Sequence, residues 1–115
     1  MIREAWKNLA EFGTKAGYIG FVVLTEMSVS EATSLLEARL QRYRGQRYQQ
    51  LLPLLNHPTF LEGIGPSGAP FRMEVSIFWE KKPFGNLRVF GIIDALFGEQ
   101  AESPVVQSFV VGPGE

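Results

Sequence analysis

The sequence predicts an α+β fold in which two helices from the first half of the chain pack on a four-stranded antiparallel β-meander. Apolar residues recur at helical spacing between residues 28 and 55, whereas residues 71–97 alternate with a period of two. Turn-forming Gly, Pro and Asn separate the strands, which favours antiparallel neighbours over alternating βαβ units. The 115 residues therefore fit one domain over 27–115, preceded by an extension over 1–26.

The extension is predicted to hold a short helix over residues 2–12, closed by Gly13, and an apolar strand over residues 18–25. Its apolar run falls short of the roughly 20 residues that span a bilayer, so we expect no membrane partner. Glu4 and Glu11 also make it a poor signal peptide. Alternatively, Met27 is the natural translation start, and residues 1–26 are an appendage.

The first helix of the domain is predicted to begin at Ser28, which forms a capping box with Glu31. A second helix is expected over residues 46–55, kinked or shortened by Pro53 and ended by Pro58. His57 is the sole histidine, and we expect it to cap this second helix rather than to catalyse.

Four strands are expected after the helices, over residues 59–64, 71–80, 87–97 and 105–111. The glycine-rich segment 63–68 has no lysine and no following helix, so it is predicted to be a turn and not a phosphate loop. A turn over residues 82–86 would place Lys81 opposite Leu87.

That register pairs Glu80 with Arg88, Phe78 with Phe90, and Glu74 with Asp94 across two strands. Facing carboxylates can form a general acid and base or bind a hard cation, so a hydrolase-like or metal-binding site at Glu74 and Asp94 is one functional alternative. Arg72, on the same face, would neutralise the pair, and a register shift of two residues would remove it. We therefore expect no metal and no cofactor.

The absence of cysteine excludes thiol catalysis, disulfides and zinc-thiolate sites. With a single histidine as well, the chain is expected to be a non-enzymatic domain. Cysteine-free chains suit the cytosol and the periplasm alike, and we expect a soluble, cytoplasmic protein.

The net charge of -1 conceals two opposed segments. Residues 38–61 contain Arg39, Arg42, Arg44 and Arg47 and no acid, whereas Asp94, Glu99, Glu102 and Glu115 follow Val89 without a base. The arginines are interleaved with Tyr43 and Tyr48, and this pattern makes nucleic-acid binding a second functional alternative. We do not expect nucleic acid to be the partner. The simpler interpretation is that the two segments meet, within one chain or across a symmetric dimer.

Large apolar residues occupy both faces of the predicted sheet, with Phe78, Phe90 and Ile92 opposite Val75 and Trp79. If helices cover one face, the other is free for a partner. The leading hypothesis is thus that the chain is a module that binds a protein partner or associates with a second copy of itself as a homodimer. We expect its binding residues to be Phe78, Phe90, Ile92, Arg39, Arg42 and Arg47.

One stretch of the chain resembles small bacterial proteins that have no assigned function. It runs from about Leu51 to Val111 and includes the hairpin segments Met73–Glu80 and Gly85–Asp94. The resemblance implies a bacterial origin and supplies no site residues.

Overall fold

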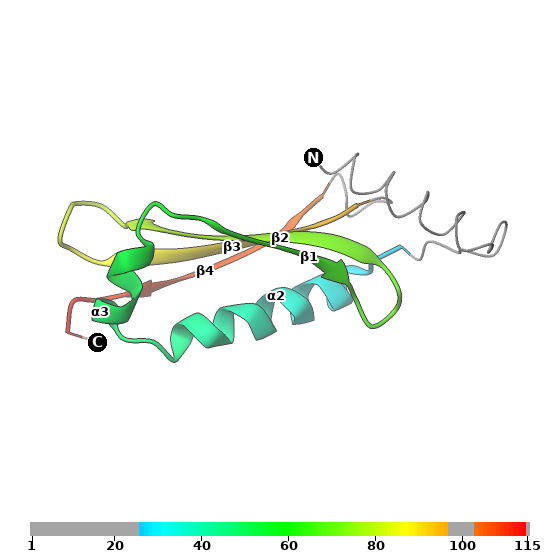
Figure 1. Cartoon of the computed structure of the whole chain (residues 1–115), viewed down its shortest axis with the longest axis horizontal. Coiled ribbons are helices and arrows are strands. Elements are labelled where there is room, and N and C mark those ends of the chain that lie inside the picture. The colour runs from blue at the N-terminus through cyan, green and yellow to red at the C-terminus, as the bar shows by residue number, and fades with distance from the viewer. Residues whose placement is uncertain (1–25, 97–102, 115) are drawn as a thin grey trace, which may run out of the picture.

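The computed structural model describes residues 26–96 and 103–114 and confirms the α+β arrangement (Figure 1). The helix and strand expected within residues 1–25 lie outside the described residues. The elements in chain order are α2 (Val29–Arg44), α3 (Tyr48–Leu51), the 3₁₀ helix η1 (Leu52–Leu54), β1 (Thr59–Ile64), β2 (Pro70–Trp79), β3 (Leu87–Ala95) and β4 (Val105–Val111).

The four strands form one antiparallel sheet in the order β1-β2-β3-β4, which is the predicted meander. Helix α2 runs along one face of the sheet (Figure 1). We call this the inner face, and odd-numbered strand residues such as Met73, Val89 and Ile93 point into it and are buried. Buried leucines and an alanine of α2 complete the core, so this face provides the hydrophobic stabilisation of the domain.

Helix α2 lies unusually close to β3 because Gly91 has no side chain. A Cβ atom built at Gly91 would lie 2.8 Å from Leu36 Cδ1 and 3.1 Å from Leu40 Cδ2. Both leucines are 0% exposed. Glycine in a strand interior often marks such a close approach, and here it lets the helix seat its leucines directly on the sheet.

The N-terminus of α2 begins at the predicted residue, but its capping box is only half formed. The Glu31 backbone N–H donates to Ser28 Oγ at 3.0 Å, as expected. The Glu31 carboxylate instead accepts from Ser67, at 2.6 Å from the hydroxyl and 3.1 Å from the backbone N–H. Glu31 therefore joins the start of α2 to the β1–β2 loop, a long-range contact that a local capping pattern cannot reveal.

The second helix is shorter than predicted, because Pro53 permits only one turn of α3 and then the 3₁₀ turn η1. The buried Tyr48 hydroxyl donates to the Gly85 carbonyl at 2.8 Å and ties α3 to the β2–β3 hairpin. The exposed His57 follows η1, and its backbone N–H donates to the Leu54 carbonyl at 3.0 Å.

The predicted hairpin register is wrong by two residues. In the structure Trp79, not Lys81, pairs with Leu87, and β3 ends at Ala95. The turn is longer than expected: the Glu80 backbone N–H donates to the Asn86 carbonyl at 2.8 Å, and Phe84 adopts a positive φ of 64°. Few residues other than glycine adopt such a φ, which is why the sequence did not indicate this turn. A shift of two residues keeps every side chain on its predicted face but changes its partner.

Candidate binding surface

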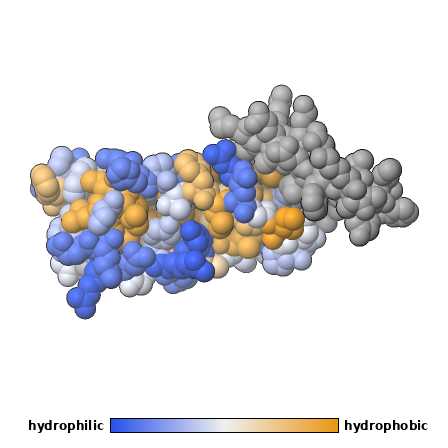
Figure 2. Space-filling model, in the orientation of Figure 1, coloured by the Kyte–Doolittle hydropathy of each residue, from blue (hydrophilic) through white to orange (hydrophobic). Residues whose placement is uncertain are grey.

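The face of the sheet opposite α2 consists of the even-numbered strand residues, and we call it the outer face. Apart from Pro70, which is buried at the start of β2, its side chains are exposed or half-buried, whereas the described helices place their buried residues in the core on the inner face. Figure 2 shows hydrophobic surface interspersed with hydrophilic patches on one side of the molecule. The outer face is therefore the candidate binding surface, and its composition indicates the kind of partner that it suits.

Five apolar side chains form the centre of the outer face. Phe78 is 37% exposed and its ring centroid lies 6.3 Å from that of the half-buried Phe90. Ile92 pairs with Val106, which is 47% exposed, and Val110, which is 37% exposed, pairs with Arg88. We call Phe78, Phe90, Ile92, Val106 and Val110 the apolar centre. The three apolar residues predicted to bind a partner all belong to it.

Charged residues gather toward the β2–β3 hairpin, where Arg88 lies between Phe78 and Val110 and the others follow in the turn. Arg88 forms a salt bridge with Glu80 through two nitrogens, Nε at 2.9 Å and Nη2, and its Nη1 donates to Ser108 Oγ at 2.6 Å. The hydrogen bonds from Arg88 lower the pKa of Glu80. Lys81 and Lys82 follow in the turn and are exposed. We call Glu80, Lys81, Lys82 and Arg88 the basic end, since three bases and one acid give it a formal charge of +2.

The opposite end of the outer face is acidic. Glu62 and Asp94 both pair in register with Arg72, whose guanidinium also lies 4.9 Å from the Phe60 ring centroid. Glu74 accepts a hydrogen bond from the Ser76 hydroxyl at 3.0 Å. We call Glu62, Arg72, Glu74 and Asp94 the acidic end, and three acids and one base give it a formal charge of -2.

Glu74 and Asp94 do not face each other as predicted. Glu74 pairs with Ile92 and Asp94 pairs with Arg72, so the carboxylates are diagonal neighbours on the outer face. Burial is the main factor that raises the pKa of Asp94; Arg72 opposes the shift and Glu74 adds to it. In residues 26–96 and 103–114, no group of three or more His, Cys, Asp or Glu side chains is placed to hold a metal ion.

The same register shift makes the other two predicted pairs diagonal, yet both contacts form. Phe78 stands opposite Arg88, and Phe90 opposite Ser76. The Phe78–Phe90 ring contact and the Glu80–Arg88 salt bridge nevertheless exist, because long side chains reach a diagonal neighbour.

The predicted basic residues lie away from the outer face, around the end of α2. Arg42, Arg44 and Arg47 are exposed and Arg39 is half-buried. Basic side chains in the last turn of α2 interact favourably with its dipole. Tyr43 and Tyr48 are buried in the core, so the two tyrosines expected to stack on bases are not accessible.

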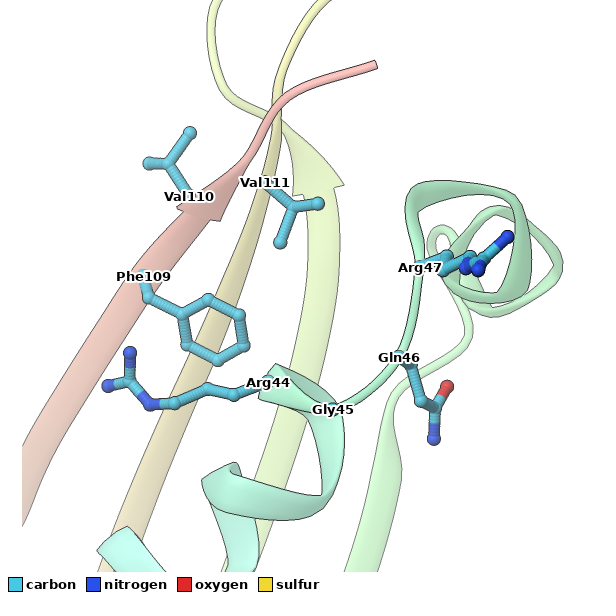
Figure 3. A pocket seen from close by; sticks show the side chains of 7 residues that line it. All are labelled: Arg44, Gly45, Gln46, Arg47, Phe109, Val110 and Val111. Carbon is cyan, nitrogen blue, oxygen red and sulfur yellow. The ribbon is translucent and has the colours of Figure 1, made fainter. Parts of the chain in front are cut away.

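A cavity of about 440 Å³ lies where α2 ends beside β4. The Arg44 guanidinium carbon lies 4.4 Å from the Phe109 ring centroid, while Arg47 lies across the cavity from that ring (Figure 3). Arg44 therefore stacks on a residue of its own chain, and the two arginines do not converge on one point. A second cavity, of about 630 Å³, lies at the hairpin between Lys82, Phe84 and Pro113.

Neither the described helices nor the comparisons with known proteins assign this chain to a class. None of the described helices is long and apolar enough to cross a membrane. Comparison of the chain with models of known families, with curated proteins and with solved structures gives no match.

Proposed function

We propose that this chain is a non-enzymatic module that acts by self-association through the outer face of its sheet. The observation that supports the proposal is the apolar centre, a group of partly exposed aromatic and aliphatic side chains opposite the helix-covered face, with Arg88 between Phe78 and Val110. Specific protein interfaces commonly have an apolar core and a polar rim. The outer face has this anatomy in part. Glu80, Lys81 and Lys82 lie at one end and Glu62 and Asp94 at the other, whereas Arg88 and Glu74 lie beside members of the apolar centre.

The charged residues of the outer face also suit burial at the rim of an interface. Arg88 already satisfies the Glu80 carboxylate, and Arg72 stands opposite Asp94. Charges that are paired within one chain lose less on partial desolvation than isolated charges. Bringing a second sheet over the apolar centre therefore removes apolar surface from water while Glu80 and Arg88 keep each other as partners.

The dimensions of the face predict a weak dimer. Four strands about 4.8 Å apart and rows spanning about 25 Å give a flat area of about 450 Å² per copy. Two copies would bury about 900 Å², just below the roughly 1,000 Å² that specific interfaces usually reach. We expect a dimer that dissociates at micromolar concentrations, since small interfaces usually belong to transient complexes.

Sedimentation velocity over a concentration series tests the proposal. The wild-type chain should shift from monomer to dimer, and Phe90→Asp, which places a charge in the apolar centre, should remain monomeric. Val29→Asp is the matched control, because Val29 is 57% exposed at the start of α2 and lies outside the outer face. Far-UV circular dichroism should show both variants folded. A wild-type chain that stays monomeric, or a Phe90→Asp variant that dimerises like Val29→Asp, would refute the proposal.

We further propose a cytoplasmic location in a bacterial cell, which the resemblance to bacterial proteins supports and with which the cysteine-free composition is compatible. Fractionation of cells that express the native gene tests it. Recovery in the periplasmic or membrane fraction would contradict it.

A further inference from the structure

Two sheets that pair through their outer faces can have their strands parallel or antiparallel. The charges on the outer face distinguish these two orientations. The acidic end has a formal charge of -2 and the basic end +2. The row of Ser76, Phe90 and Ser108 separates the two groups of charges along the strands. Two copies with parallel strands would superimpose like ends. Two copies with antiparallel strands would place each basic end over an acidic end.

We infer that two copies of this chain pair outer face to outer face with their strands antiparallel, the basic end of each copy over the acidic end of the other. The inference rests on the proposed function and assigns its geometry. A two-fold axis that lies between the two sheets and runs perpendicular to their strands produces this arrangement. Such an isologous contact is closed, so association stops at a dimer.

The position of the axis follows from the strand register. The row that joins Ser76 and Phe90 lies midway between the row of Arg72 and Asp94 and the hairpin residues Glu80 and Asn86. The axis therefore passes near Phe90, and the Phe90 rings of the two copies meet at the centre. A large aromatic at the middle of an interface is the usual site of strongest binding.

The two ends differ in how many of their charges are already paired within the chain. The salt bridge at the basic end uses Arg88 and Glu80, while Lys81 and Lys82 are exposed in the turn beyond it. At the acidic end, Glu62 is exposed on β1 and Glu74 accepts from the neutral Ser76. The lysines of one copy and the two glutamates of the other are thus the groups that attract across the interface.

A charge-swap experiment tests the orientation. The double variant Lys81→Glu/Lys82→Glu changes the basic end from +2 to -2, and Glu62→Lys/Glu74→Lys changes the acidic end from -2 to +2. Each variant alone should dimerise at least tenfold more weakly than wild type, because both end contacts become repulsive. An equimolar mixture should form a heterodimer with an affinity within about threefold of wild type, because both contacts become attractive again.

Salt dependence gives a second readout. Raising the ionic strength should weaken the wild-type dimer and strengthen the residual dimer of each single-end variant, since screening acts on attraction and repulsion alike. Variants that dimerise as wild type does, or a mixture that stays monomeric, would overturn the antiparallel inference while the Phe90→Asp result still supported the proposed function. A monomeric wild-type chain would overturn both, and would indicate that residues 1–25 or a different protein cover the outer face.

Discussion

Substituting Gly91 by alanine should destabilise the fold, because the added methyl group enters occupied space. Its Cβ would lie 2.8 Å from Leu36 Cδ1, whereas nonbonded carbons favour about 3.5–4.0 Å. The two leucines are fully buried and have no solvent to turn into. Overpacking typically costs about 1–3 kcal/mol, and the lower backbone entropy of alanine returns about 0.5–1 kcal/mol. The difference is about 0–2.5 kcal/mol, and because neither leucine can move into solvent we expect a loss of about 1–2 kcal/mol in the free energy of unfolding.

Urea denaturation measures this loss as a lower midpoint at an unchanged m-value. Gly114→Ala is the control, because a Cβ at that position meets nothing within 4 Å. Leu36→Ala alone should cost about 2–5 kcal/mol, and the double variant should cost less than the two single losses together, since the new methyl occupies part of the vacated space. If Gly91→Ala were as stable as wild type, or if the two substitutions were additive, the close approach of α2 to β3 would be refuted.

Two further predictions concern hydrogen bonding and pH. Tyr48→Phe removes the hydroxyl that donates to the Gly85 carbonyl, so the urea midpoint should fall by the equivalent of about 1 kcal/mol, with an unchanged midpoint contradicting the bond. Burial raises the pKa of Asp94 above its ordinary value of 3.8, so the folded state retains this proton to a higher pH than the unfolded state does. This carboxyl therefore lowers stability as pH rises from 3.8 through the raised pKa, and Asp94→Asn should be more stable than wild type above that window and equal to it below. Urea midpoints from about pH 3 to about pH 7 check this, and an advantage for Asp94→Asn that persists at the acid limit would contradict it.

Local patterns were sufficient to predict the fold. Alternation identified the strands, and Ser28 together with the spacing of Ala32, Leu36 and Leu40 identified α2. These signals depend on neighbours within a few residues, and sequence alone displays them. The second helix was predicted too long, because a proline indicates an interruption without indicating whether a 3₁₀ turn follows.

The sequence predicted which apolar residues share a face of the sheet, but not their cross-strand partners. Arg39, Arg42 and Arg47, which were also predicted to bind, lie away from that face. Phe78, Phe90 and Ile92 do lie together on one face, because a period of two fixes the face of each side chain. Which face the helix covers depends on Gly91, whose missing side chain admits the leucines of α2. The register depends on the hairpin turn, where Phe84 adopts a backbone conformation that the sequence did not suggest.

The order of the elements has a consequence for synthesis of the protein. Among the described elements, helix α2 precedes all four strands, yet it packs against β3 and β4, which are translated last of the four. Its apolar side chains, including those of Leu36 and Leu40, therefore lack the strand residues that they pack against until the intervening residues have been translated, at about 5–20 residues per second. A chain arrested before β4 would present an incomplete inner face to the helix, and such nascent chains are where chaperone contact or aggregation should concentrate.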